Sequence, residues 1–217
     1  MSDFLLWRQL IQHLQSEIAF GLEELPTKQS KLVDKSEALA ALENEFKNCQ
    51  MCVLGSTRTK LVFGAGNPNA DLMFIGEAPG FDEDKQGLPF VGAAGQLLTK
   101  MILAMNLTRE KVYIANCLKC RPPGNRNPLP TELATCNPIL LRQIEIIKPK
   151  IICTLGKFAT QSLLQTQDSI SRLRGQFFEA YNTRVMPTFH PAYLLRNPAD
   201  KKLAWEDMQK IMKELER

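Results

Sequence analysis

The sequence predicts an α/β protein: a three-layer α/β/α sandwich with a central four-stranded parallel sheet, preceded by an N-terminal helical extension. Three observations predict this class. Four short apolar runs recur along the chain, stretches with helical periodicity separate them, and most runs end in a turn with glycine, proline or a polar residue. Strands that alternate with helices favour right-handed crossovers, which make neighbouring strands parallel and cover the sheet with helices.

The expected elements of the sandwich follow one another along the chain. The apolar runs predict buried strands at residues 72–75, 112–115, 151–155 and 185–189. Helical patterns lie between and after these strands, at residues 95–105, 131–147, 157–164 and 201–216. The residues Pro130, Thr131 and Glu132 are typical of a helix start, which supports the second of these helices.

The N-terminal part has a different character. Residues 2–22 carry one apolar stripe at helical spacing, residues 26–35 look like a polar linker, and residues 36–47 predict a second helix. We therefore expect two parts, an extension with its linker at residues 1–48 and the α/β/α domain at residues 49–217. The extension carries no chemical motif, so we expect it to pack or dock, with another protein as its candidate partner.

Composition excludes several classes of protein. The 217 residues are 44% hydrophobic and 23% charged, which is ordinary for a globular protein. No apolar run approaches the roughly 20 residues that cross a bilayer, and the first residues lack the basic region and cleavage site of a secretory signal. We therefore expect a cytoplasmic protein without a membrane partner.

The charge is mild but uneven. The net charge is +4, yet residues 1–48 carry five Lys or Arg against eight Asp or Glu, so the positive excess lies in residues 49–217. A basic body suits a polyanionic partner such as nucleic acid. A solvated basic surface explains the same charge equally well.

The six cysteines indicate a metal site. Cys49 and Cys52 form one Cys-x-x-Cys pair, and Cys117 and Cys120 form another. In a cytoplasmic chain of this size, clustered cysteines bind metal or do redox chemistry more often than they form disulfides. Four thiolates suit an iron–sulfur cluster or a tetrahedral zinc ion, and spacing alone does not choose between them.

Three of the expected strands end in residues that carry chemistry. The first ends in Gly76-Glu77-Ala78-Pro79-Gly80, the second in Asn116, and the fourth in Thr188-Phe189-His190-Pro191. The carboxyl ends of parallel strands line the binding crevice of an open sheet, so we expect these groups to converge on one pocket. The chain has no P-loop motif, and Gly64-x-Gly66 precedes a strand, so a nucleotide-binding fingerprint is not supported.

The motifs, in this order, resemble the uracil-DNA glycosylase superfamily, and in particular its family four, the iron–sulfur uracil-DNA glycosylases. The resemblance spans about residues 49–198 and is specific because the pieces occur together. They are the first Cys-x-x-Cys pair, GEAPGFDEDKQGLPFVGAAGQLL, VYIANCLKCRPPGNRNP, ELATC, PKIICTLG and TFHPAYLLRNP. The resemblance implies excision of uracil from DNA without a lyase step, and it leaves the N-terminal 40 or so residues outside the match.

The resemblance implies roles for Phe90 and for residues at the strand ends, and the chemistry of these side chains agrees with those roles. Phe90 would stack on a base that has left the helix, with Gly76 and Ala78 beside it. The amide of Asn116 offers a donor and an acceptor side by side, which matches uracil and mismatches cytosine. One N–H of His190 would stabilise the negative charge that develops near O2 of the departing uracil.

The sequence does not decide which residue positions the attacking water. Ala78 stands where better-known members of the superfamily have an aspartate that orients the attacking water. Glu77, Glu83 and Asn125 are the candidates to position water or to stabilise the sugar cation, with Glu77 the first choice. Glu83 could instead wall off the pocket against the methyl group of thymine, and Asp82-Glu83-Asp84 could be only a solvated acidic turn.

The resemblance also sorts the cysteines and the basic residues. Its ligand pattern falls on Cys49, Cys52, Cys120 and Cys136, and it favours a [4Fe-4S] cluster over zinc. Leu194, near His190, is the expected wedge that fills the gap left by the flipped nucleotide, unless it faces the core. The expected contacts to uracil-containing DNA, single- or double-stranded, are Arg121, Arg126, Arg172, Arg174 and Arg196.

Three other functions are weighed against this one. The first is an inactive, metal-stapled module that binds DNA or a polymerase. The second is a covalent uracil trap, which we discount because residues 119–137 contain no histidine. The third is an electron-transfer protein, whose cysteines would lie closer together in the sequence. We expect a monomeric glycosylase.

Overall fold

The computed structural model describes residues 34–216. The chain divides into two units, Met1–Val33 and Asp34–Arg217, so the helix expected at residues 2–22 lies outside the described residues. The second unit begins with helix α2 (Lys35–Phe46), which confirms the helix expected at residues 36–47. Leu39 and Leu42 of α2 are buried in the core of this second unit.

The second unit is built on one sheet of six strands in the order β1-β3-β2-β4-β6-β5. The four central strands are parallel, as expected, and are β3 (Tyr113–Asn116), β2 (Leu72–Gly76), β4 (Ile151–Leu155) and β6 (Thr183–Thr188). The expected count of four was too low, because antiparallel strands β1 (Ala65–Gly66) and β5 (Phe178–Ala180) extend the two edges. Neither edge strand is long enough to leave an apolar run in the sequence.

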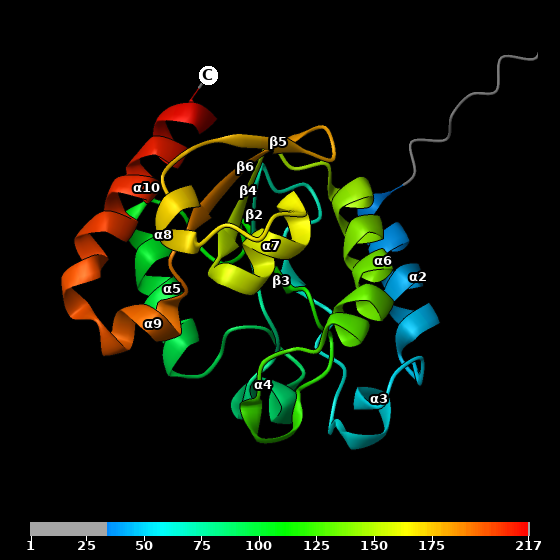
Figure 1. The fold of residues 1–217 in the computed structure, drawn as a ribbon. Helices are drawn as coiled ribbons and strands as arrows, with labels where there is room; N and C mark the ends of the chain where they lie inside the picture. Colours follow the sequence, from blue (N-terminus) through cyan, green and yellow to red (C-terminus); the bar gives the residue numbers. More distant parts are fainter. Residues whose placement is uncertain (1–33, 217) are drawn as a thin grey trace, which may run out of the picture. The chain divides into compact units, whose positions relative to one another are not determined.

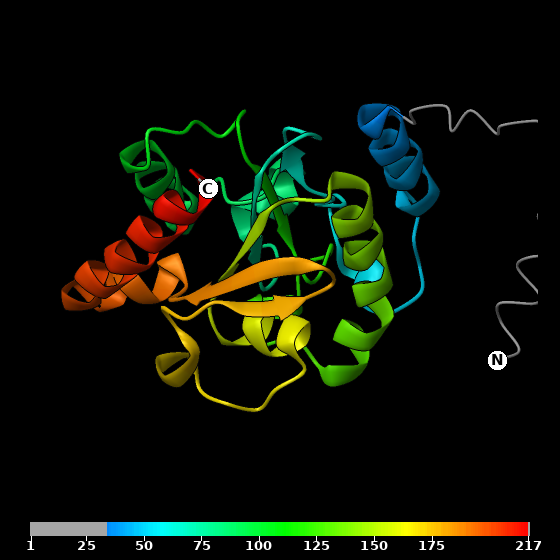
Figure 2. The same cartoon turned by 90° about the horizontal axis from the view of Figure 1, so that it is seen from above.

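Helices cover both faces of this sheet and make the expected three layers (Figure 1, Figure 2). On one face, α2 lies beside α6 (Pro130–Ile147), and α7 (Lys157–Leu164) joins the same apolar cluster. On the other face lie α5 (Ala93–Ala104) and α10 (Lys201–Leu215). Neighbouring residues of β2 alternate between the two clusters, as a pleated strand requires.

Several short helices were not expected from periodicity, because one or two turns hold too few residues to show it. They are α3 (Leu54–Thr57), α4 (Phe81–Gln86), η1 (Pro123–Asn125), α8 (Ile170–Leu173), α9 (Pro191–Arg196) and η2 (Pro198–Asp200). Helix α4 contains the acidic run Asp82-Glu83-Asp84. The interpretation of this run as only a solvated acidic turn is wrong. Asp84 is buried, and its Oδ1 accepts a hydrogen bond from the backbone N–H of Thr59 at 2.9 Å.

The order of the strands places the binding crevice. The chain goes from β2 to β3 on one side of the sheet and then to β4 on the other side of β2. Such a change of direction leaves a crevice at the carboxyl ends of the strands. None of the described helices has the length and apolar character needed to cross a membrane.

Candidate active site

A cleft of about 530 Å³ opens beyond the carboxyl ends of β2 and β6. Its wall comes from the segment after β2, from the start of α5, from the loop after β3 and from α9. The residues expected in the site that line it are Glu77, Ala78, Glu83, Phe90, Asn125, Arg126, His190 and Arg196. The residues after β2 and β6 therefore share one cleft, whereas Asn116 at the end of β3 is not among the residues that line it.

Gly76, at the end of β2, brings Phe90 and Asn116 together. A methyl group on Gly76 would lie 2.5 Å from Cζ of Phe90 and still closer to Oδ1 of Asn116, so only glycine leaves room for both side chains. Asn116 is 2% exposed, and its Oδ1 has no hydrogen-bond partner within the described part of the chain. A buried acceptor without a partner is costly, so this oxygen is set up to receive a donor from a ligand.

His190 lies beside the same ring. The centroids of the Phe90 and His190 rings are 5.7 Å apart, and Gly156 at the end of β4 makes room for the histidine, because a methyl group there would lie 2.8 Å from Cβ of His190. His190 is the N-cap of α9, and its Nδ1 accepts the backbone N–H of Ala192 at 3.1 Å. The proton of the neutral imidazole therefore sits on Nε2.

The environment of His190 keeps it neutral. The pKa of His190 is lowered to about 4, mainly by burial and also by the positive charge of Arg196, while Glu83 partly opposes this shift. Above pH 5 the ring is thus an uncharged N–H donor. Burial has the opposite effect on Glu77, whose pKa it raises to about 7, because desolvation disfavours the charged form of either group.

Glu83 holds the backbone around the cleft together. Its carboxylate accepts hydrogen bonds from the N–H groups of Val91 and Gly92, both at 2.9 Å, and of Gly80 at 3.1 Å. Asn125, the other candidate for positioning water, accepts a hydrogen bond on Oδ1 from Nε of Arg121 at 2.7 Å. Both side chains line the cleft, but each already has partners within the protein.

The four cysteines expected as ligands face one small cavity of about 20 Å³. Cys49 and Cys52 come from the segment before α3, Cys120 from the loop after β3 and Cys136 from α6. Arg58 Nη1 lies 3.2 Å from the sulfur of Cys120, and the backbone N–H of Lys119 lies 3.3 Å from that of Cys136. An all-sulfur donor set with N–H groups directed at sulfur fits a cluster or zinc site.

The described side chains do not already form a metal-binding group. Among residues 34–216, no three His, Cys, Asp or Glu side chains are arranged to hold a metal ion. Burial also raises the pKa of Cys136 to about 11 and that of Cys120 above its usual range, so the thiolate forms need compensating positive charge. Cys117 and Cys153, which are not expected ligands, are buried in the core.

The comparison with known sequences agrees with this geometry. The family model "Uracil DNA glycosylase superfamily" matches residues 63–211. The chain is 45% identical over 186 residues to a type-4 uracil-DNA glycosylase of Saccharolobus solfataricus, covering 82% of this chain and 86% of that protein. It is 44% identical to one of Archaeoglobus fulgidus and 46% identical to one of Sulfurisphaera tokodaii, covering 92% and 84% of those proteins. The chain belongs to the type-4 uracil-DNA glycosylases.

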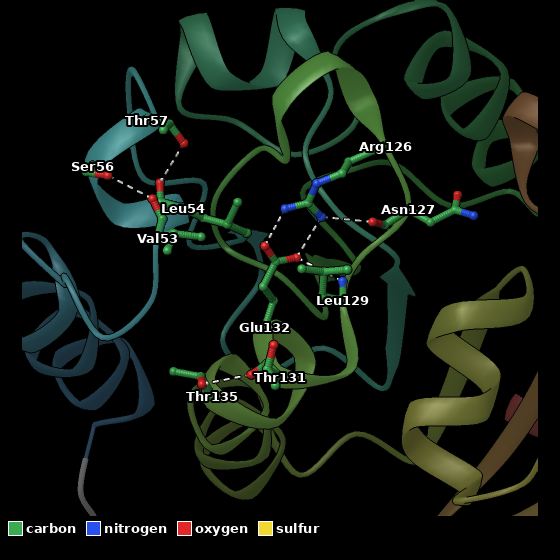
Figure 3. Close-up of polar contacts among 10 residues, drawn as sticks. All are labelled: Val53, Leu54, Ser56, Thr57, Arg126, Asn127, Leu129, Thr131, Glu132 and Thr135. Atoms are coloured by element: carbon green, nitrogen blue, oxygen red, sulfur yellow. Dashed lines mark hydrogen bonds and ion pairs between the residues drawn. The ribbon is translucent and has the colours of Figure 1, made fainter.

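The expected DNA-contacting arginines of this type-4 glycosylase chain fall into two groups. Arg196 is exposed on the cleft wall, and Arg126 lines it while forming a two-pronged ion pair with Glu132 at the start of α6 (Figure 3). Arg174 was assigned wrongly: its guanidinium is held by the buried carboxylate of Asp207 and by the carbonyl of Leu203. Arg172 is exposed but pairs with Asp168 and does not line the cleft.

Leu194 is wrong as the expected wedge residue. Leu194 is 1% exposed and packs in the apolar cluster with Phe189 and Ala204, so it faces the core. Leu195, its neighbour on α9, is 43% exposed. Successive residues of a helix point about 100° apart, which is why one leucine faces inward and the next outward.

Three residues in and around the type-4 site were not found from the sequence. Arg109, in the loop before β3, donates to the carbonyl groups of Pro89 and Phe90 and so contacts the backbone of a residue that lines the cleft. Phe81 is 49% exposed and lines the cleft, with Nζ of Lys85 4.3 Å from its ring centroid. Gly156 had the signal of a glycine at a strand end, but its contact with His190 depends on the packing of β4 against β6.

Proposed function

We propose that this chain removes uracil from DNA: it takes the base out of the helix, hydrolyses the N-glycosidic bond, releases free uracil and leaves an abasic site. The observation that carries the proposal is that Phe90 and His190 line one cleft with their rings side by side, while the side chain of Asn116 lies next to Phe90 at Gly76. A flat apolar face, a buried amide and a neutral N–H donor are the groups that a pocket for an extruded pyrimidine needs. The named relatives support the same activity.

Asn116 would select uracil. Uracil has an N3–H donor and an O4 acceptor on its pairing edge, and the unpartnered Oδ1 of Asn116 would accept N3–H while the amide NH₂ donates to O4. Cytosine has an acceptor at N3 and a donor at N4. It would leave the buried Oδ1 facing a lone pair and the NH₂ group facing another donor, which a site of this kind rejects strongly.

His190 would stabilise the departing base. As the glycosidic bond lengthens, the sugar gains positive charge and uracil gains negative charge near O2. The neutral His190 would direct its Nε2–H at that oxygen, since Nδ1 is occupied by the N–H of Ala192. The donor is placed before the charge develops, so little reorganisation is required in the transition state.

Glu77 would act on the sugar side of the bond. It lines the cleft directly after Gly76, and its raised pKa of about 7 leaves it partly ionised at neutral pH. As a carboxylate it would stabilise the sugar cation or orient the attacking water. Asn125 and Glu83 remain candidates for the same role, but their side chains are engaged with Arg121 and with backbone N–H groups.

The DNA would cross the mouth of the cleft. Arg196 and Arg126 lie on its walls, and Arg121 lies 5.0 Å from the ring centroid of Phe81. An exposed aromatic ring between cations suits a nucleotide next to the extruded one, with stacking on the ring and phosphate contacts from the cations. Leu195, exposed on α9, takes the place of Leu194 as the proposed wedge.

The cysteine cavity would hold a [4Fe-4S] cluster through Cys49, Cys52, Cys120 and Cys136. The bound cluster supplies cross-linking and positive charge for four thiolates. The chain would thereby tie the segment before α3 to the loop after β3 and to α6, which orients Arg121 next to Cys120. Purified protein should be brown with broad visible absorbance, and a colourless protein with one zinc ion would contradict this assignment.

The test of the function is an excision assay with purified full-length protein. Oligonucleotides carry U·G, U·A, hypoxanthine or single-stranded uracil, and cleavage at abasic sites is read after alkaline treatment. We expect release of uracil and retention of cytosine, and we expect an Asn116→Ala variant to lose the activity. Protein that binds these oligonucleotides but releases no base would instead support the inactive DNA-binding module. A monomeric state and a cytoplasmic location belong to the same proposal.

A further inference from the structure

The backbone of Phe90 is in an unfavourable conformation. Its φ is 54°, in the left-handed region that residues with a bulky side chain rarely adopt. Such a conformation costs on the order of 1–3 kcal/mol and persists only where the surroundings fix it. The ring of Phe90 is buried against Gly76 and His190, so the position of its backbone decides where the proposed stacking face lies.

Arg109 holds the two carbonyl groups of this part of the backbone. It lies in the loop between α5 and β3, and its Nη2 donates to the carbonyl of Pro89 at 2.7 Å while Nη1 donates to that of Phe90 at 3.0 Å. Nη1 also contacts the hydroxyl of Thr99 on α5 at 3.2 Å. The planar guanidinium thus holds two successive carbonyl groups, a geometry that lysine cannot reproduce.

Other groups complete the restraint. Glu83 accepts the N–H groups of Val91 and Gly92, so the peptide groups on both sides of Phe90 are held by a charged side chain. Gly95 leaves room for the carbonyl of Phe90, since a methyl group there would overlap it. Arg109 is not among the residues that line the cleft.

We propose that Arg109 is a positioning residue for base excision: by holding the carbonyl groups of Pro89 and Phe90 it sets the stacking face of the uracil pocket. The inference rests on the proposed function, and it assigns Arg109 no contact with DNA or with the base. Its loss should let the Phe90 loop relax and misplace the ring. Misplacement by about 1 Å lowers the rate of an enzymatic step by about a hundredfold.

The experiment is a double-mutant cycle on a single-stranded uracil oligonucleotide. The full-length wild type, Arg109→Met, Phe90→Ala and the double variant are compared for kcat, KM and inhibition by free uracil. We expect Arg109→Met to lower kcat by about ten- to a hundredfold, to weaken inhibition by uracil and to leave KM for DNA within about twofold. In the Phe90→Ala background the further loss should be less than about threefold, because Arg109 would act through that ring.

The controls separate positioning from general stability. Arg142→Met removes another arginine with two partner contacts, in the exposed pair with Glu45, and should leave kcat unchanged. Arg109→Lys should restore only part of the rate, and it replaces Arg109→Met in the cycle if the methionine variant does not fold. Independent, multiplicative losses from Arg109 and Phe90, or an unchanged kcat in folded Arg109 variants, would overturn the inference. Wild-type protein that releases no uracil would instead overturn the proposed function.

Discussion

The rings of Phe90 and His190, a hundred residues apart in the chain, lie with their centroids 5.7 Å apart and their planes tilted by 33°. A base that stacks on Phe90 would therefore present its edge to the imidazole. Because the side chains of Phe90 and Asn116 meet at Gly76, the stacking face, the reading amide and the N–H donor would act on one ligand.

Replacing Asn116 by alanine should abolish base recognition with little loss of fold. The variant lacks both polar groups that would pair with uracil, so we expect kcat/KM for uracil to fall on the order of a hundredfold or more. The measurement is single-turnover release of uracil, with Asn44→Ala, a change on the exposed face of α2, as the matched control. Equal activity of the two variants would exclude Asn116 from recognition.

Replacing Gly76 by alanine should damage the site more than the fold. The added methyl group meets Phe90 and Asn116 and must displace one of them, so we expect at least a tenfold loss of kcat. Asn44→Ala, on the exposed face of α2, is the control. An active Gly76→Ala enzyme would show that the site tolerates a shifted ring.

The pH dependence should report Glu77. Its pKa is about 7, so if the carboxylate is the active form, the excision rate should rise with pH through about 7 and then level off. His190, with a pKa of about 4, should not titrate in this range. The excision rate of Glu77→Gln should be low and should not change with pH between about 5.5 and about 8.5. A wild-type rate that is flat across pH 7 would remove Glu77 from this role.

Glu77→Gln should lower the excision rate but raise the stability of the folded chain at high pH. The pKa of Glu77 is higher in the folded chain than the ordinary 4.5, so the folded state binds more protons and loses stability as pH rises from about 4.5 to about 7. Glu77→Gln removes this cost. Its melting temperature should exceed that of the wild type at pH 8, and the two should differ little at pH 4.5, which thermal unfolding at both pH values will measure.

The two leucines of α9 should behave oppositely. Leu194 is buried, and Leu194→Ala should destabilise the fold by about 2–5 kcal/mol while folded enzyme keeps its rate. Leu195 is exposed, and Leu195→Ala should keep its stability but excise uracil more slowly, with a larger loss on duplex than on single-stranded DNA. Urea unfolding and parallel assays on both substrates give the comparison, and an equal loss on both substrates would contradict a wedge.

The arginines should separate by salt dependence. Arg196→Ala should make the slope of log binding constant against log salt concentration shallower by about one released counterion. The reason is that an exposed cleft residue that contacts a phosphate releases one counterion from the DNA. Arg174→Ala should instead lower stability and leave the salt dependence of folded protein unchanged, because Arg174 pairs with buried Asp207. Binding titrations at several salt concentrations test both expectations.

Much of the fold could be predicted because its signals are local. The apolar runs became the four parallel strands, and every long helix expected in the described residues is present within a few residues of its predicted bounds. The edge strands and one-turn helices escaped because they are too short for periodicity to show. Cys49, Cys52, Cys120 and Cys136, which the resemblance to a known family marks as ligands, line one cavity.

By itself the sequence determined the four parallel strands and therefore that Gly76, Asn116 and Thr188 end at one edge of the sheet, because parallel strands bring their carboxyl ends to one edge. Phe90 lies in a loop, and only the resemblance to a known family marked it. Only the tertiary structure decided which of two adjacent leucines is buried, that Arg174 pairs with Asp207, and that Arg109 reaches the Phe90 loop. The contact of Arg109 with Phe90 joins residues 19 positions apart, and that of Arg174 with Asp207 joins residues 33 positions apart. Such contacts are set by how helices and loops pack, and spacing along the chain carries no record of them.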